Sequence, residues 1–241
     1  MSGSSLKNAG QPPPSKAAHT LRIGGLTGLS CSDYPGQLAA VVFCQGCPWR
    51  CGYCHNSHLI PSRATAPVRW REVEAFLLRR RGLLDAVVFS GGEPTLQAGL
   101  ADAMRIVRHL GFRVGLHTAG AYPARLQALL PLTDWIGMDV KAPFATYAAT
   151  TGRRSSGKAA LASMQIILAS GVEHEFRTTV DPGLLPAPQL RALISQLSDL
   201  GVRRYALQES RAGNGVAPSY LDQNFLAPLA RRFASFAVRR A

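Results

Sequence analysis

Residues 39–56 have the sequence AAVVFCQGCPWRCGYCHN, which joins an uninterrupted apolar run to a loop carrying four cysteines. An apolar run of this length, with no alternation, is typical of a strand buried on both faces, as in a parallel sheet covered by helices. Loops that follow the carboxyl ends of such strands form the active sites of these folds. The segment therefore predicts both a fold class and the position of a site.

The pattern that begins at residues 39–43 repeats along the chain. Further apolar runs lie at residues 86–89, 113–116, 135–138, 175–180 and 205–207, and segments of helical spacing lie at 69–81, 96–110, 124–130, 158–169 and 188–200. Gly111, Gly171 and Gly201 fall where helices should stop. Six strands alternating with helices predict an α/β fold, a partial (β/α)6 TIM-like barrel rather than a closed eight-stranded one. Residues 220–238 predict a final helix packed on the outside.

Length and composition indicate one catalytic domain. The chain has 241 residues, of which 46% are hydrophobic and 17% charged, as in ordinary globular proteins. Residues 1–20 are nearly devoid of apolar side chains and predict a disordered tail, which leaves residues 21–241 as the domain. No stretch has the length of a signal peptide's apolar region or of a membrane span, so we expect a soluble, cytoplasmic protein with no membrane partner.

The charge of the chain is strongly positive. Its 27 Lys and Arg residues exceed its 14 Asp and Glu residues and give a formal net charge of +13. Such a balance raises the question of nucleic-acid binding. The basic clusters are not interleaved with stacking aromatic residues, however, and this favours a solvated basic surface over a nucleic-acid footprint.

All five cysteines lie between residues 31 and 54, an odd number in a chain with no export signal. This arrangement favours metal or redox chemistry over disulfides. Cys47, Cys51 and Cys54 have the spacing C-x3-C-x2-C, which supplies three thiolates to an iron-sulfur cubane and leaves its fourth iron open for a ligand. Cys31 and Cys44 are expected to be small buried residues instead.

Two other interpretations of the cysteine loop stay open. A zinc site could use four ligands drawn from Cys44, Cys47, Cys51, Cys54, His55 and His58, although four ligands on one loop suit tetrahedral zinc poorly. A redox pair of Cys44 and Cys47 would leave the two later cysteines unexplained. The cluster accounts for more of the pattern than either alternative.

Polar residues follow the other predicted strands at the same edge of the sheet. They are Ser90-Gly91-Gly92-Glu93-Pro94, His117-Thr118, Asp139-Val140-Lys141 and Gln208-Glu209, with Arg177 inside the fifth strand. Because the carboxyl ends of parallel strands meet at one rim, we expect these groups to share a site with the cysteine loop.

The cysteine motif, with aromatic Tyr53 before its last cysteine, resembles the signature of the radical S-adenosylmethionine (SAM) superfamily. The wider context of Ser32-Asp33-Tyr34-Pro35-Gly36 and Cys54-His55-Asn56 resembles the activating enzymes of glycyl-radical proteins, above all those of anaerobic ribonucleoside-triphosphate reductase. The resemblance runs from about Leu21 to the last strand. It implies an oxidoreductase in which SAM binds the open iron of a [4Fe-4S] cluster and is cleaved reductively to a 5'-deoxyadenosyl radical.

The resemblance also implies roles for particular residues. Cys47, Cys51 and Cys54 would hold the one cluster, since no cysteine follows them. Gly91, Gly92 and Glu93 would meet the methionine amino group of SAM, Thr118 would provide a polar contact and Arg177 would bind the carboxylate. Asp139 and Lys141 would be catalytic residues near SAM and the incoming peptide. The alternatives are an ordinary turn at Gly-Gly-Glu-Pro, a surface ion pair between Asp139 and Lys141, and a structural ion pair of Arg177.

Two positions depart from the family pattern. His117 stands where the family has an aspartate, and Gln208-Glu209 stands where some relatives have a histidine. No catalytic role is assigned to Gln208-Glu209.

The implied partners are a glycyl-radical protein, namely anaerobic ribonucleoside-triphosphate reductase, and a flavodoxin- or ferredoxin-type electron donor. One alternative keeps the chemistry but acts on a small molecule, as 7-carboxy-7-deazaguanine synthase does. Another, from a different class, is a zinc-stabilised nucleic-acid binder without catalysis.

Overall fold

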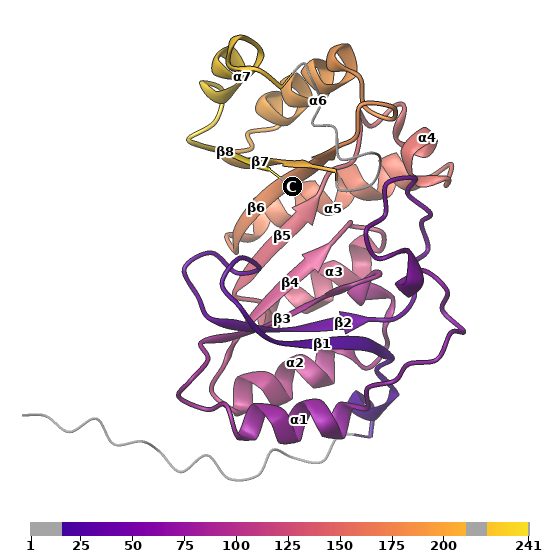
Figure 1. Ribbon diagram of the computed structural model, residues 1–241, viewed down its shortest axis with the longest axis vertical. Helices are drawn as coiled ribbons and strands as arrows, with labels where there is room; N and C mark the ends of the chain where they lie inside the picture. Colours follow the sequence, from indigo (N-terminus) through magenta and orange to yellow (C-terminus); the bar gives the residue numbers. More distant parts are fainter. Residues whose placement is uncertain (1–15, 211–220, 241) are drawn as a thin grey trace, which may run out of the picture.

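The computed structural model describes residues 16–210 and 221–240, which form one eight-stranded sheet with helices along its outer side (Figure 1). The strands are β1 (Ile23–Ser30), β2 (Ala39–Cys44), β3 (Ala86–Gly91), β4 (Arg113–Thr118), β5 (Trp135–Asp139), β6 (Glu173–Val180), β7 (Arg204–Glu209) and β8 (Ser235–Arg239). The α-helices are α1 (Trp70–Leu78), α2 (Leu100–His109), α3 (Pro123–Leu129), α4 (Tyr147–Thr151), α5 (Ser156–Ser170), α6 (Ala187–Asp199) and α7 (Gln223–Ala230).

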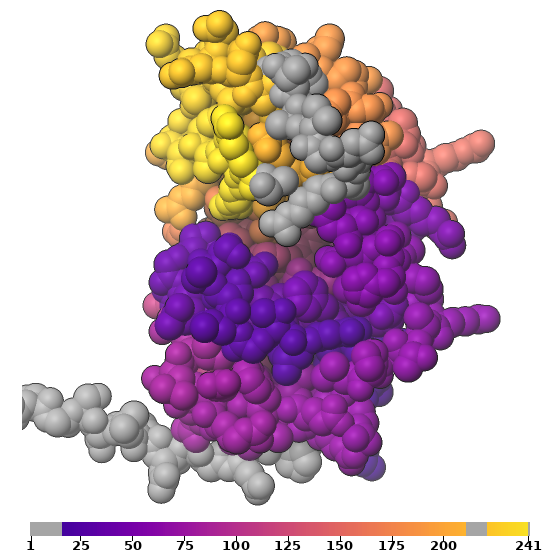
Figure 2. All heavy atoms as spheres, viewed as in Figure 1, coloured from indigo at the N-terminus to yellow at the C-terminus, as the bar shows by residue number. Residues whose placement is uncertain are grey.

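The strand order follows the chain, and all pairs from β2 to β8 are parallel. Strands β2 to β7 are the six predicted ones, each followed by a helix, so the prediction of a partial barrel is confirmed. Strand β1 pairs antiparallel with β2, and among the described strands β1 and β8 each have one neighbour only. The sheet is therefore open. In Figure 2 the indigo N-terminal strands and the yellow C-terminal residues lie on the same face of the molecule.

The prediction of a final helix over residues 220–238 is wrong. Helix α7 ends at Ala230, and β8 then pairs with β7. The large apolar residues Phe225, Leu229, Phe233 and Phe236 follow one another at helical spacing, which conceals the turn between the two elements. Phe233 and Phe236 instead reach the Tyr205 ring from a turn and a strand, with ring centroids 4.9 and 6.0 Å away.

Alternate residues of each strand face two different cores. In β2, Ala40, Val42 and Cys44 pack towards the helices, whereas Ala39 and Val41 belong to a smaller cluster inside the barrel. This period of two is the ordinary geometry of a strand. As a consequence, the residues that face the barrel interior near the carboxyl end of each strand are separated from those that pack against the helices.

The loop between β1 and β2 closes the interior below that rim. The Tyr34 ring stacks on Trp135 with centroids 5.3 Å apart, and both side chains are buried. A Cβ atom on Gly115 would lie 3.1 Å from the Tyr34 ring, so the smallest residue of β4 accommodates it. Aromatic residues thus form an apolar floor beneath the polar groups described below.

Helix ends match the sequence expectation. Gly111, Gly171 and Gly201 have φ angles of 94°, 72° and 83°, which glycine adopts readily. At the other end of the chain, the predicted tail lies mostly outside the described residues. Its last residues form the 3-10 helix η1 (Ala18–Thr20), with Ala18 buried.

Candidate active site

The cysteine loop begins where β2 ends and is held by backbone hydrogen bonds to a returning segment. The Gly46 amide donates to the Leu59 carbonyl oxygen at 2.7 Å, and the amide that follows it donates to Ile60 at 3.0 Å. The Gln45 side-chain amide donates to the carbonyl of Pro61 at 2.8 Å. These bonds involve no thiol, so the path of the loop is fixed by the chain itself.

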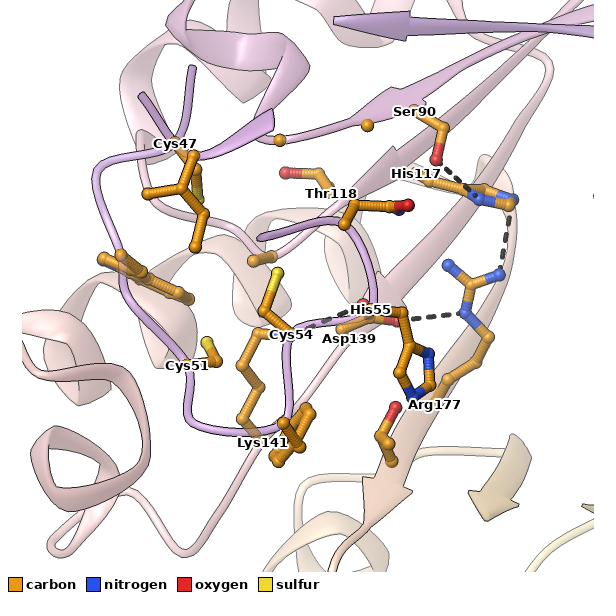
Figure 3. A pocket seen from close by; sticks show the side chains of 18 residues that line it. Cys47, Cys51, Cys54, His55, Ser90, His117, Thr118, Asp139, Lys141 and Arg177 are labelled. Atoms are coloured by element: carbon orange, nitrogen blue, oxygen red, sulfur yellow. Dashed lines mark hydrogen bonds and ion pairs between the residues drawn. The ribbon is translucent and has the colours of Figure 1, made fainter. Parts of the chain in front are cut away.

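Cys47, Cys51 and Cys54 line one pocket, and each is partly exposed. Figure 3 shows their side chains on one side of the pocket, with His117 and Arg177 on the other. Cys44 is buried among the core residues, as expected. Cys31 is exposed, and the prediction that it is buried is wrong, because it lies in the loop after β1.

The three thiols form the donor set of an iron-sulfur cubane, which offers each thiolate its own iron. Among residues 16–210 and 221–240, no three His, Cys, Asp or Glu side chains are grouped so as to hold one metal ion. Burial raises the pKa of the Cys47 thiol to about 12 and also raises the pKa of Cys51. Metal coordination is what makes thiolates favourable in such surroundings.

The pocket also presents a buried polar atom without a partner. The Tyr53 hydroxyl is buried and has no hydrogen bond within the described structure, yet Tyr53 lines the pocket. Buried hydroxyl groups normally have a partner, and one left alone marks a place where a bound group belongs. The donor set and this orphaned hydroxyl both fit a cofactor-binding site.

Gly91 and Gly92 pack the end of β3 directly against the cysteine loop. Gly91 has a φ of 108°, and a Cβ atom there would lie 2.5 Å from the Cys44 nitrogen. A Cβ atom on Gly92 would lie 2.3 Å from the Gly46 carbonyl oxygen. Both glycines line the pocket, so they form a bare backbone surface that a ligand can approach closely.

Glu93 lies beneath the pocket instead of lining it. Its side chain is fully buried, and Oε1 accepts hydrogen bonds from the Thr95 amide at 3.0 Å and from the Thr118 hydroxyl at 2.8 Å. Oε2 accepts from the Ala119 amide at 2.9 Å. The Thr118 hydroxyl in turn accepts from the Gly120 amide at 2.9 Å. Glu93 and Thr118 thus tie the turn after β3 to the turn after β4.

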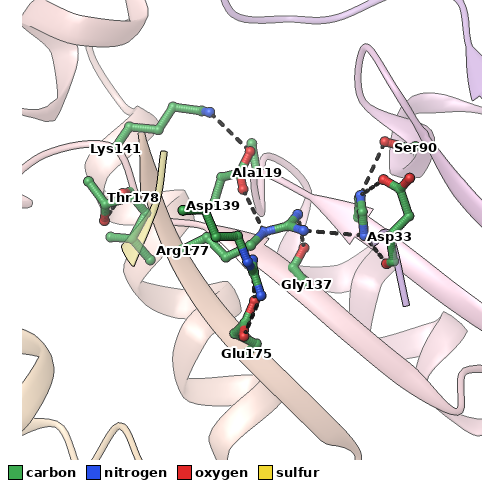
Figure 4. A network of polar contacts seen from close by, with 12 residues as sticks. Asp33, Ser90, Ala119, Gly137, Asp139, Lys141, Glu175, Arg177 and Thr178 are labelled. Atoms are coloured by element: carbon green, nitrogen blue, oxygen red, sulfur yellow. Dashed lines mark hydrogen bonds and ion pairs between the residues drawn. The ribbon is translucent and has the colours of Figure 1, made fainter. Parts of the chain in front are cut away.

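Asp139 at the end of β5, Lys141 two residues after it and Arg177 within β6 lie together in the structure. Arg177 Nε lies 3.2 Å from Asp139 Oδ1, and Lys141 Nζ lies 3.5 Å from Oδ2 (Figure 4). Arg177 Nη2 also donates to the Gly137 carbonyl at 3.3 Å. All three charged side chains line the pocket that holds the cysteines.

The opposite charges of Asp139 and its two basic neighbours stabilise the ionised form of each side chain. Burial alone would raise the Asp139 pKa, but Lys141 and Arg177 outweigh it and hold that pKa below its ordinary value. For Lys141, burial works to lower the pKa, while Tyr53 and Asp139 keep it well above the ordinary range. The Asp139 side chain is 34% exposed, against 11% for Lys141 and 8% for Arg177. Asp139 is therefore the member most open to an incoming molecule.

Two tyrosines beside Lys141 were not among the predicted site residues. The Lys141 ammonium lies 5.7 Å from the centre of the Tyr53 ring, and its backbone amide donates to the Tyr147 hydroxyl at 3.1 Å. Tyr147 also meets Trp49 of the cysteine loop edge to face, at 5.8 Å. The position of Tyr53 inside the cysteine motif was a visible signal. Tyr147 begins the short unpredicted helix α4, and nothing local in the sequence indicates its contact.

His117 connects the loop between β1 and β2 to the charged group. Its Nε2 lies 2.7 Å from the Asp33 carbonyl oxygen, so this nitrogen carries the donated hydrogen. Its Nδ1 lies 3.4 Å from the Ser90 hydroxyl. Arg177 Nη1 lies 3.3 Å from the same Nε2, a contact between two donors and not a hydrogen bond. The residue that departs from the family pattern thus still faces the site, through the Asp33 backbone and Arg177.

We predict that His117 makes stability depend on pH. Burial, then Arg177, lowers its pKa to about 3 from 6.5. A lowered histidine pKa means that the unfolded chain binds the extra proton first, so stability is complete above about pH 6.5 and falls by about 1.4 kcal/mol per pH unit below it. Urea unfolding of native protein and His117→Gln at pH 7 and pH 5 should show a smaller loss in the variant. Equal losses would contradict the prediction.

Residues 41–188, more than half of the chain, match the family described as the Radical SAM superfamily. This chain belongs to the radical SAM superfamily. The family implies a [4Fe-4S] cluster and SAM as cofactors, which the three cysteines and the pocket accommodate. The protein is an enzyme of the oxidoreductase type expected from the sequence.

Several curated proteins are similar to this chain. A Methanocaldococcus jannaschii protein named as a glycyl-radical enzyme activating enzyme is 29% identical over 197 residues, 78% of this chain and 79% of that one. The pyruvate formate-lyase-activating enzyme of Clostridium pasteurianum is 33% identical over 125 residues, 50% of this chain and 52% of that one. The 7-carboxy-7-deazaguanine synthase of Thermococcus kodakarensis is 28% identical over 126 residues, 44% of this chain and 50% of that one. The last two matches thus span about half of each relative.

Solved structures share the fold at low identity. Streptococcus suis SuiB bound to S-adenosylmethionine superposes with a TM-score of 0.57 at 15% identity, covering 82% of this chain and 48% of that one. anSMEcpe with bound AdoMet and a peptide gives a TM-score of 0.58 at 15% identity, over 80% and 60% of the two chains. Within the described residues, no helix is long and apolar enough to cross a membrane.

Proposed function

We propose that this enzyme generates a glycyl radical on a partner protein, with its cluster on Cys47, Cys51 and Cys54. The carrying observation is that three thiols and the group of Asp139, Lys141 and Arg177 line one pocket. The similarity to a protein named as a glycyl-radical enzyme activating enzyme, over 78% of this chain, supports the choice of substrate class.

The residues on the β3 and β6 side would hold SAM. When bound, the cluster and SAM supply a carbon-centred radical by one-electron cleavage. The bare backbone at Gly91 and Gly92 admits the methionine amino group, and Arg177 pairs with the carboxylate. Glu93 supports this surface from beneath, through its hydrogen bond to the Ala119 amide, and Thr118, which lines the pocket, accepts from the Gly120 amide and would offer SAM a polar contact.

The residues at the end of β5 would receive the partner. Asp139 is the most exposed of the charged group, and Lys141 stands between it and Tyr53. An ion pair at this position can hold SAM from one side and the backbone of an incoming peptide from the other. His55 and Asn56, which follow the last cluster cysteine, line the same pocket. On the strength of these motifs we assign the partner as anaerobic ribonucleoside-triphosphate reductase.

The test is electron paramagnetic resonance on the anaerobically reconstituted, reduced protein mixed with SAM and the reductase. We expect a glycine-centred doublet, and no doublet when the radical-bearing glycine of the reductase is replaced by alanine. SAM cleavage without a doublet would overturn the protein substrate. Turnover of a pterin substrate with no protein partner would then favour the small-molecule reaction, which the 28% match to 7-carboxy-7-deazaguanine synthase keeps as a second candidate.

A further inference from the structure

Acidic residues are absent from the chain segment that contains the cysteine loop and from a second segment that contacts it. Residues 34–71 contain four arginines and no Asp or Glu, and residues 140–172 contain two lysines, two arginines and again no acid. Eight of the chain's basic residues therefore lie in stretches that contain no acidic residue of their own. The net charge of +13 is concentrated, not spread evenly.

The fold brings these two segments together. The Arg50 amide donates to the Thr151 carbonyl oxygen at 2.9 Å, and a Cβ atom on Gly152 would lie 3.9 Å from that of Arg50. The Trp49 ring of the first segment also meets the Tyr147 ring of the second edge to face. In Figure 2 the purple and salmon spheres of the two segments adjoin at the right-hand edge of the molecule.

Arg50, Arg153, Arg154 and Lys158 are all exposed, and we call these four residues the basic face. None of them forms an ion pair with an acidic group of the described residues. Arg50 lies between Cys47 and Cys51 in the sequence, so this face includes the outer surface of the loop that holds the cluster. The charged group around Asp139 faces the pocket instead.

We propose that the basic face docks the acidic one-electron carrier protein, of the flavodoxin type, that reduces the cluster. The inference rests on the proposed function, because reductive cleavage of SAM requires an electron from outside this chain. The carrier is oxidised by one electron, the cluster is reduced by one, and no covalent bond forms or breaks. An acidic carrier is steered to an unpaired positive surface, and docking here places it against the cluster loop without obstructing the pocket.

The experiment follows reduction of the reconstituted cluster by a purified reduced flavodoxin in stopped flow, through the loss of iron-sulfur absorbance. We expect Arg153→Glu/Arg154→Glu to slow reduction at least about tenfold, and to weaken binding of oxidised flavodoxin similarly, because the change reverses two charges of the face. For the native protein, the rate should fall steeply as salt is raised from roughly 50 to 300 mM and the charges are screened.

The matched control is Arg231→Glu/Arg232→Glu, an exposed arginine pair that follows α7. Helix α7 lies apart from α4, the helix that precedes Arg153, in Figure 1. The control makes the same change in net charge but leaves the basic face intact. It should therefore be reduced by flavodoxin at the native rate.

Reduction by dithionite separates this inference from the function on which it rests. Dithionite should reduce the cluster of both variants and of native protein equally, and SAM cleavage should follow in all three. Failure of SAM cleavage in native protein with dithionite would defeat the proposed function. Native-like reduction of Arg153→Glu/Arg154→Glu by flavodoxin, or an equal loss in the control, would overturn the docking face. If Arg153→Glu/Arg154→Glu, reduced by dithionite, cleaved SAM normally but gave less glycyl radical, the basic face would bind the protein substrate. That result would also overturn the proposal that it docks the electron carrier.

Discussion

A chain with Cys47, Cys51 and Cys54 all replaced by alanine is expected to fold, to bind no iron-sulfur cluster and to cleave no SAM. Folding should survive because the loop is held by backbone hydrogen bonds, such as Gly46 to Leu59, and not by the thiols. Loss of the cluster should be complete because the three thiols are its only predicted ligands from this chain. Circular dichroism, iron and sulfide analysis and SAM turnover after anaerobic reconstitution measure the three outcomes.

The two remaining cysteines provide the controls. Cys31→Ala should be silent, since Cys31 is exposed in the loop between β1 and β2. Cys44→Ala should keep the cluster and lose about 1 kcal/mol of stability, because it removes a small buried side chain from the core. Loss of iron in Cys44→Ala would revive the zinc and redox interpretations. Retained SAM cleavage in the triple variant would contradict the cluster assignment itself.

The parts of the fold that could be predicted are those specified by local pattern. Strands β2 to β7 are apolar runs that stand out from the helices between them, and their order follows from the chain. Strand β1 has the sequence IGGLTGLS, in which three glycines leave no apolar run to recognise. Strand β8 was concealed because the helical spacing of Phe225, Leu229 and Phe233 runs on into it.

The same division applies to the site. The rim residues were predictable because strand order alone places the ends of parallel strands together, and the cysteine spacing is local. The orientation of Glu93 was not, since its hydrogen bonds reach Thr118 and Ala119 across the neighbouring strand. The contact between Asp33 and His117 joins positions 84 residues apart. Such contacts depend on how the loop between β1 and β2 folds into the barrel, which no periodicity encodes.

Replacing Arg177 by methionine is expected to weaken SAM binding by about 10- to 100-fold. A hydrogen bond to a charged group contributes about 1.5–3 kcal/mol, and each 1.4 kcal/mol is about a tenfold change in affinity. Methionine keeps much of the apolar volume in β6 but removes the forked donor that a carboxylate requires. Isothermal titration of SAM into the reconstituted protein gives the dissociation constant, and urea unfolding gives the stability.

The two readouts separate a ligand contact from a structural ion pair. Arg177 also bonds Asp139, so some loss of stability is expected, although Lys141 remains 3.5 Å from that carboxylate. Arg204→Met is the matched control, because Arg204 begins the next strand and its exposed side chain pairs with Glu173 away from the pocket. It should leave SAM affinity unchanged. Arg177→Lys should bind SAM with intermediate affinity, since it keeps the charge and loses the fork. If Arg177→Met lowered only the free energy of unfolding and left the SAM dissociation constant at the native value, Arg177 would be a structural partner of Asp139 and nothing more.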